Sequence, residues 1–128
     1  MKNFALLFLL GLLMGCTSAS ENDISGKWMM HKVIQNDQDV TSQHNPHQER
    51  YIILKNDSLF ESGGRPYGKN TGKYKWNEAE HTLFLDSDAG ADDDSHWKVR
   101  VGNDTMYWQG LGSEWAEAFQ IIQIRAKQ

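Results

Sequence analysis

The sequence predicts an all-β domain, an antiparallel up-and-down meander of eight strands that closes into a small barrel. Two observations support this prediction. Short runs rich in Val, Ile, Tyr, Phe and Trp alternate with turn residues from residue 26 onward, a pattern typical of β-strands. Most connections between these runs are short, and tight turns join antiparallel neighbours. Closing such a meander into a barrel removes its exposed edges, although a sandwich of two sheets would have the same strand pattern.

Four strands are predicted in the first half of the domain, at 28–34, 50–55, 58–62 and 72–76. Asn56 and Asp57 supply the turn between the second and third strands, because both residue types favour turns. Pro66 lies in the break after the third strand, and proline is disfavoured in a central strand. The connection 36–48 is long for a hairpin, so we expect a short helix or a lid there.

Four further strands are predicted in the second half, at 81–85, 96–101, 105–108 and 118–125. The Gly-Asn-Asp sequence at 102–104 is a strong hairpin signal. The segment 113–118 is expected to form a single helical turn. Side chains alternate between the two faces of a strand, so Trp97, Val99 and Val101 are expected to point into the barrel.

Ahead of the barrel, the chain begins like an exported lipoprotein. Lys2 precedes an almost unbroken apolar run at 4–14, which has the length of a signal-peptide core and is too short to span a bilayer of about 30 Å. The sequence Leu-Met-Gly-Cys at 13–16 resembles the lipobox of bacterial lipoproteins. This resemblance implies cleavage before Cys16, whose thiol would receive diacylglycerol. The predicted organisation is a signal peptide at 1–15, a lipidated flexible tether at 16–25 and a barrel domain at 26–127.

The lipid is expected to hold the protein on a membrane of the cell envelope. Each buried CH₂ of an acyl chain such as palmitate contributes about 0.8 kcal/mol, and two or more chains anchor a protein stably. Thr17 stands where an Asp tends to retain enterobacterial lipoproteins in the inner membrane, so the outer membrane is favoured. Cys16 is the only cysteine, and no internal disulfide is expected.

Charge and motifs exclude several classes of function. The formal net charge is −4 and no basic stripe is visible, so nucleic acid is not an expected partner. The sequence contains no G-x-S-x-G elbow, no H-E-x-x-H pair and no phosphate loop, so a binding protein is favoured over an enzyme and no cofactor is expected. We expect a monomer that contacts the membrane through its lipid and binds a small hydrophobic ligand.

The order of motifs along the barrel resembles one family of proteins. Gly26-Lys27-Trp28 opens the first strand, the segments 72–77 and 81–85 form a hairpin with Tyr, Trp and Leu at alternate positions, and 121–125 ends the barrel with a hydrophobic strand. With the lipobox and the length, this set resembles the lipocalin-like lipoproteins of Gram-negative bacteria, especially the Bacteroidota. The resemblance covers residues 24–127 and implies a lipocalin-like barrel.

The resemblance also implies how the barrel is closed. In lipocalins a Trp on the first strand seals the closed end, and an Arg from the last strand lies across it. Trp28 and Arg125 match these two residues. An Arg over an indole face is a favourable cation–π pair, worth about 0.5–2 kcal/mol.

The candidate ligand site is the barrel interior. The residues expected to line it are Met30, Tyr51, Trp76, Trp97 and Trp108, beside Trp28. An eight-stranded barrel holds either its own side chains or one small ligand. A cavity lined by these residues would be apolar and would suit a lipid, sterol-like or aromatic ligand. A filled barrel would instead be an interaction module that binds an envelope protein or glycan through its loops.

The acidic loop 86–94 is the candidate for metal binding. It holds five of the seventeen acidic residues of the chain, and Asp86, Asp88 and Asp92 alternate with small residues in a way that suggests calcium ligands. The spacing does not match an EF-hand loop, so a solvated acidic loop is favoured and no metal site is predicted. His44 and His47 are interpreted as exposed loop histidines.

Overall fold

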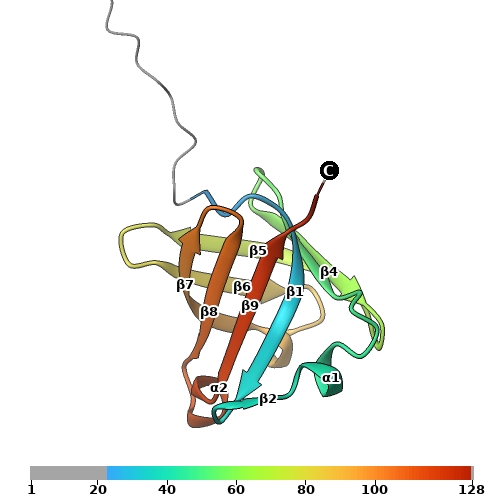
Figure 1. Ribbon diagram of the computed structural model, residues 1–128. Coiled ribbons are helices and arrows are strands. Elements are labelled where there is room, and N and C mark those ends of the chain that lie inside the picture. Colours follow the sequence, from blue (N-terminus) through green and yellow to red (C-terminus); the bar gives the residue numbers. More distant parts are fainter. Residues whose placement is uncertain (1–22, 128) are drawn as a thin grey trace, which may run out of the picture.

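The computed structural model describes residues 23–127, which form a closed antiparallel barrel of eight strands and one short extra strand (Figure 1). Each barrel strand pairs with the next along the chain, and the last strand pairs antiparallel with the first. The prediction of an all-β meander closing into a barrel is confirmed. The barrel strands are β1 (Gly26–Gln35), β3 (Tyr51–Leu54), β4 (Leu59–Gly64), β5 (Tyr67–Asn77), β6 (Thr82–Ser87), β7 (Ser95–Gly102), β8 (Thr105–Leu111) and β9 (Phe119–Arg125).

Short elements occupy the longer connections. The connection 36–50 contains strand β2 (Gln38–Asp39) and helix α1 (Thr41–His44), which agrees with the short helix expected there. The acidic loop contains the 3-10 helix η1 (Ala91–Asp93), and helix α2 (Glu114–Glu117) forms the single helical turn expected before the last strand. Ser113 caps α2, because its side chain accepts a hydrogen bond from the Ala116 backbone N–H.

β5 is longer than the sequence predicts. Its second half was expected from the apolar alternation at 72–76, whereas residues 67–71 are polar or small and mostly exposed. These residues pair with β4, and the pairing with β6 begins only at Gly72, opposite Ser87. The β4–β5 hairpin therefore extends beyond β6.

A β-bulge in β1 reverses which side chains of the strand point into the barrel after it. The pairing with β9 shifts register between Met30 and Lys32, and such a bulge adds one residue to the strand. Trp28 before the bulge and Val33 after it are both buried, although they stand five positions apart. Strict alternation would have placed one of them outside.

Two clusters of apolar side chains form the core. The larger lies inside the barrel, and its most deeply buried members are Trp28, Leu54, Leu83, Val99 and Met106. The smaller lies beneath the connection 36–50 and consists of Val33, Val40 and Phe119. Trp97 and Val101 are partly buried against the larger cluster, so all three inward-facing residues expected on β7 point inward.

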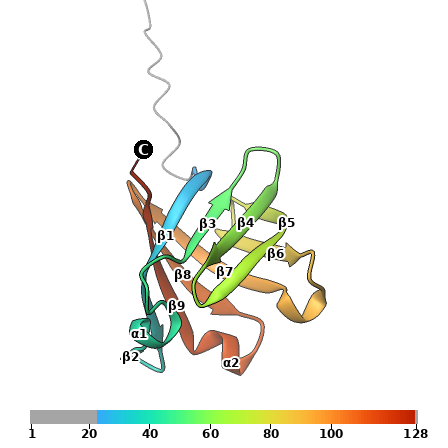
Figure 2. The ribbon, with the colours of Figure 1, turned by 90° about the vertical axis from the view of Figure 1, so that its right-hand side faces the viewer.

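The two ends of the barrel differ in how they are covered (Figure 2). β1 begins and β9 ends at one end, where the turns are short; α1, β2 and α2 lie at the other. Ile24 is 3% exposed and belongs to the core of the first end. Residues 23–25, which the sequence predicts to be part of the tether, therefore pack against the barrel.

The predicted signal peptide at 1–15 and Cys16 lie outside the described residues. Their cleavage and lipidation stay predictions. Of the helices in residues 23–127, none has both the length and the apolar character needed to cross a membrane.

Candidate functional site

A cavity of about 510 Å³ lies in the barrel, and its lining extends to residues of the connection 36–50, the β4–β5 hairpin and the acidic loop. Its inner wall is mainly apolar, with Ser62, Ser95 and Gln123 as polar members, and comes from β3, β4, β6, β7, β8 and β9. Its mouth is more polar and lies between the connection 36–50, the β4–β5 hairpin and the acidic loop. The residues of the inner wall include Ile52, Phe60, Leu85, Trp97, Trp108 and Ile121.

Four of the five residues predicted to line the barrel border this cavity, and three of them lie on its inner side. Met30, Trp97 and Trp108 all border it. The rings of Trp97 and Trp108 pack against each other with their centroids 5.4 Å apart and their planes at 54°. Trp97 is further held by its indole N–H, which donates to Ser95 Oγ at 2.9 Å. The two indoles form one rigid side of the cavity.

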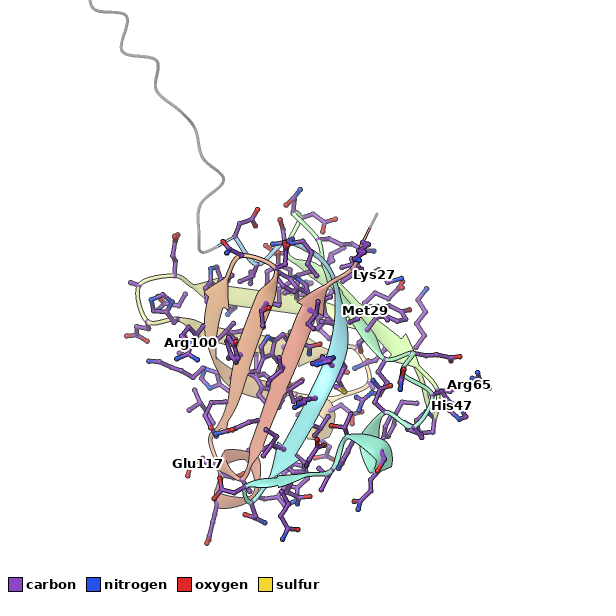
Figure 3. The ribbon with its side chains drawn as sticks, viewed as in Figure 1. Lys27, Met29, His47, Arg65, Arg100 and Glu117 are labelled. Carbon is purple, nitrogen blue, oxygen red and sulfur yellow. The ribbon has the colours of Figure 1, made fainter. Side chains whose placement is uncertain are left out.

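Tyr51 borders the cavity, but its ring lies on the outer face of β3. Its neighbours Ile52 and Leu54 are buried, and Tyr51 hydroxyl donates to Glu61 Oε2 at 2.8 Å. Lys27 Nζ lies 4.9 Å from the Tyr51 ring centroid, and Figure 3 shows Lys27 beside the start of β1. The hydrogen bond to Glu61 raises the pKa of Tyr51, because it favours the protonated phenol.

Trp76 lies away from the cavity. It borders a separate hollow at the opposite end of the barrel, together with Ile24 and Tyr74, and it packs against the larger core cluster. Its inward orientation is as expected, but β5 carries it toward the end of the barrel that residues 23–25 cover.

Two buried polar atoms at the cavity were missed by sequence reasoning. Trp108 and Gln123 are each 3% exposed and both line the cavity. Trp108 Nε1 has no acceptor and Gln123 Oε1 has no donor within the described residues. A buried polar group without a partner costs about 1–3 kcal/mol. Gln123 interrupts the apolar run at 121–124 in an inward register, and this was the available signal.

Arg50 lies at the mouth of the cavity and was also missed. Its guanidinium carbon is 4.3 Å from the Tyr67 ring centroid, and Nη1 donates to the backbone oxygen of His44 at 3.1 Å. Among residues 23–127, no carboxylate lies within ion-pair distance of it. Partial burial lowers the pKa of Arg50, because desolvation disfavours its charged form.

Asn45 fixes the backbone that carries Arg50. Its side chain is buried, with 2% exposed. Nδ2 donates to the Met30 carbonyl at 2.8 Å, and Oδ1 accepts from the backbone N–H groups of Glu49 and Arg50, both at 3.1 Å. The connection 36–50 is thereby tied to the bulged part of β1, and Arg50 is placed at the cavity rather than in a free loop.

The other cations near the mouth have acidic partners. Lys69 Nζ lies 2.9 Å from Glu61 Oε1, and Arg65 Nε donates to Glu49 Oε2 at 2.9 Å. The pair between Arg65 and Glu49 joins the β4–β5 hairpin to the connection 36–50, and Figure 3 shows Arg65 beside His47 there. Hydrogen bonding to Arg65 lowers the pKa of Glu49.

Arg125 and Trp28 meet at the closed end, as the resemblance implies. The Arg125 guanidinium carbon lies 4.2 Å from the Trp28 ring centroid, well within the range of a cation–π contact. Arg125 Nη1 donates to the Ser25 carbonyl at 2.9 Å, and Trp28 Nε1 donates to the Ile24 carbonyl at 2.9 Å. These contacts attach residues 23–25 to the barrel.

The acidic loop does not gather its carboxylates around one point. Asp88 accepts from the Thr71 hydroxyl at 2.8 Å, and Asp94 accepts from the Ser87 backbone N–H at 2.8 Å. Within residues 23–127, no group of three or more His, Cys, Asp or Glu side chains is placed to hold a metal ion. Asp86 lies near the end of β6, Asp88 follows that strand and Asp92 lies in η1, and all three are exposed.

Comparison with solved structures shows a shared fold. The barrel is similar to the crystal structure of a DUF4847 family protein from Bacteroides vulgatus ATCC 8482, with a TM-score of 0.59 over 81% of this chain and 94% of that chain. The sequences are 13% identical, so the likeness concerns the fold alone. No protein-family model and no curated protein matches the sequence.

Proposed function

We propose that this protein binds or carries a small, mainly hydrophobic ligand inside its barrel while a lipid holds it in the cell envelope. The observation that carries the proposal is the cavity of about 510 Å³ behind the loops. Small-molecule sites have volumes of roughly 300–1,000 Å³, mostly apolar walls and a few polar groups. The cavity has this size, and it combines apolar side chains of the barrel wall with polar side chains at the mouth.

Two polar atoms in residues of the wall have no hydrogen-bond partner within the described residues. Trp108 offers an N–H donor and Gln123 offers a carbonyl acceptor, and neither has a partner in the described part of the chain. Buried polar groups are nearly always hydrogen-bonded in folded proteins. Both atoms are fully buried, so a ligand would reach them only if the side chains of the wall moved.

The alternative function is an interaction module that binds an envelope protein or glycan through its loops. The observation in its favour is Trp115 on α2, which is 71% exposed and packs on Phe119 with ring centroids 4.8 Å apart. Exposed aromatic residues often mark binding surfaces. We rank this function second, because a barrel that works only through its surface needs no internal cavity.

The membrane anchor is proposed from the sequence around Cys16. A Cys16→Ser change is expected to abolish incorporation of labelled palmitate and to leave the protein uncleaved or released from membranes. Persistent labelling of this variant would disprove the anchor. The result would not bear on the cavity, because Cys16 precedes the folded barrel.

The proposed ligand binding is tested by native mass spectrometry of the protein purified from its own host, followed by lipid extraction. A bound small molecule in a one-to-one ratio would support carriage and identify the ligand. A mass that corresponds to the protein alone, with no change in tryptophan fluorescence when fatty acids are added, would favour the interaction module.

A further inference from the structure

Arg50 combines a charge, partial burial and the absence of an acidic partner. Its guanidinium stacks on Tyr67 and donates one hydrogen bond to a backbone carbonyl, that of His44. Neither contact neutralises the charge. An arginine carries five N–H donors, so most of its hydrogen-bonding capacity is unused by the described residues.

The surroundings of Arg50 place this charge at the cavity. Arg50 and Tyr67 both line it and stack on each other at its mouth, although they come from different segments: one follows α1 and the other begins β5. Lys69 also lines the mouth, but its ammonium group is paired with Glu61. Asp93 is the one carboxylate among the lining residues, and it is exposed on η1.

Guanidinium groups that are held in place and partly desolvated bind carboxylates with particular strength. The two parallel N–H···O bonds of such a pair are charge-assisted and fix the orientation of the anion. The stacking on Tyr67 and the bond to the His44 carbonyl hold the guanidinium before a ligand arrives, which reduces the entropy lost on binding.

We propose that the ligand is a small organic acid, whose carboxylate pairs with Arg50 at the mouth and whose apolar part lies against Phe60, Trp97 and Trp108. This inference rests on the proposed function, because it requires an occupied cavity. It also gives the orientation of the bound ligand: the anionic end faces the loops and the apolar end faces the closed end of the barrel.

The test compares three probes with a straight chain of ten carbons but different head groups: decanoate, 1-decanol and decyltrimethylammonium. Binding to the full chain in lipid nanodiscs is followed by the fluorescence of the tryptophans, two of which line the cavity. We expect decanoate to bind at least about ten-fold more tightly than decanol, and the cation to bind most weakly. In Arg50→Gln this preference should disappear, while the affinity for decanol stays within about two-fold of that of the unmodified protein.

Arg100→Gln is the matched control. Arg100 also stacks on a tyrosine, with its guanidinium carbon 4.7 Å from the Tyr107 ring centroid, but it is exposed on β7 and borders a different hollow from the cavity. It should keep the full preference for decanoate. Arg50→Lys, which retains the positive charge without the bidentate geometry, should keep part of it.

The outcomes separate this inference from the function on which it rests. Equal binding of decanoate and decanol by the unmodified protein would overturn the inference and leave a cavity for neutral ligands. An unchanged preference in Arg50→Gln would also overturn it, because a group other than Arg50 would then bind the carboxylate. Failure of all three probes to bind would overturn ligand binding itself. If Arg50→Gln does not fold, the inference is tested by comparing the three probes on the unmodified protein and on Arg50→Lys.

Discussion

Arg125 joins three segments of the chain at the closed end of the barrel. Its guanidinium covers Trp28, donates to the carbonyl of Ser25, and lies 3.5 Å from Asp104 in the β7–β8 turn. Trp28 is fully buried beneath it. The residue therefore protects the core at the point where residues 23–25 meet β1 and β9.

Replacing Arg125 by Ala should lower the free energy of unfolding by about 2 kcal/mol or more, because it removes a cation–π contact and a charge-assisted hydrogen bond. The measurement is urea unfolding followed by tryptophan fluorescence. Arg100→Ala is the control, since this exposed arginine also stacks on an aromatic ring, and its effect should stay within about 0.5 kcal/mol. Equal effects of the two changes would show that the closed end does not depend on Arg125.

Glu61 makes the barrel sensitive to acid. Its carboxylate pairs with Lys69 and accepts from Tyr51, and both contacts lower its pKa, that with Lys69 more strongly. A carboxyl group whose pKa is lower in the folded than in the unfolded state stabilises the fold above its unfolded pKa of about 4.3. That contribution is lost as the pH falls through the lowered folded value.

The unfolding free energy should therefore decline as the pH falls below about 5, and the decline should be shallower in Glu61→Gln. Urea midpoints measured from pH 7 to pH 3 would show this difference. Other carboxyl groups with lowered pKa values add to the effect in both proteins; they are Asp23, Asp39 and Glu49. A pH dependence identical in the two proteins would contradict the role given to Glu61.

At the scale of the elements, Gly72 in β5 lies where any side chain would collide with the neighbouring strand β6. A Cβ on Gly72 would lie 2.0 Å from the Asp86 carbonyl oxygen and 2.7 Å from the Phe60 ring, where β5 first pairs with β6. A Cβ on Gly68, in the extended half of the same strand, would meet nothing within 4 Å. Gly72 therefore permits the close approach of β5 to β6, whereas Gly68 does not serve this purpose.

Gly72→Ala should destabilise the protein by about 2 kcal/mol or more, because either the Asp86 backbone or β5 must move. Gly68→Ala should change stability by no more than about 0.5 kcal/mol. Thermal unfolding followed by circular dichroism measures the stability of both variants, which carry the same chemical change at two positions of one strand. A similar loss in both would mean that the cost is a general effect of replacing glycine in β5.

The same strand shows which elements the sequence could predict. All eight barrel strands were found from apolar runs and turn residues, because burial of one face imposes alternation. The polar half of β5 was missed, since residues 67–71 pair with β4 without burying an apolar face. Where a strand is extended only by backbone pairing, the alternation of apolar and polar side chains does not show where the strand begins.

The site was less predictable than the fold, for reasons that differ from residue to residue. Trp97 and Trp108 follow simple alternation and were correctly expected to point inward. Tyr51 faces outward because the register of β3 is set by Ile52 and Leu54. Arg50 and Gln123 were missed, because their positions depend on how the connection 36–50 and β9 pack, and polar residues carry no alternation signal of their own.

For the molecule as a whole, the central question is whether the interior is occupied by side chains or by a ligand. The sequence could not decide this, because the same bulky residues can fill a barrel or line a cavity. The structure contains the space, and Ser62 on β4 offers a way to fill it. Ser62 lines the cavity and stands two positions after the buried Phe60, on the same face of the strand.

Ser62→Phe should place a ring in the cavity and lower the affinity for decanoate at least about ten-fold, while the barrel stays folded, since the ring enters existing space rather than packed core. Lys73→Phe is the matched control, because Lys73 is exposed on the outer face of β5 opposite Leu59, and it should bind as the unmodified protein does. Equilibrium dialysis measures both. If the filled barrel kept its binding, the ligand would lie elsewhere; if it lost binding but still associated with envelope components, the surface around Trp115 would carry a second, separate activity.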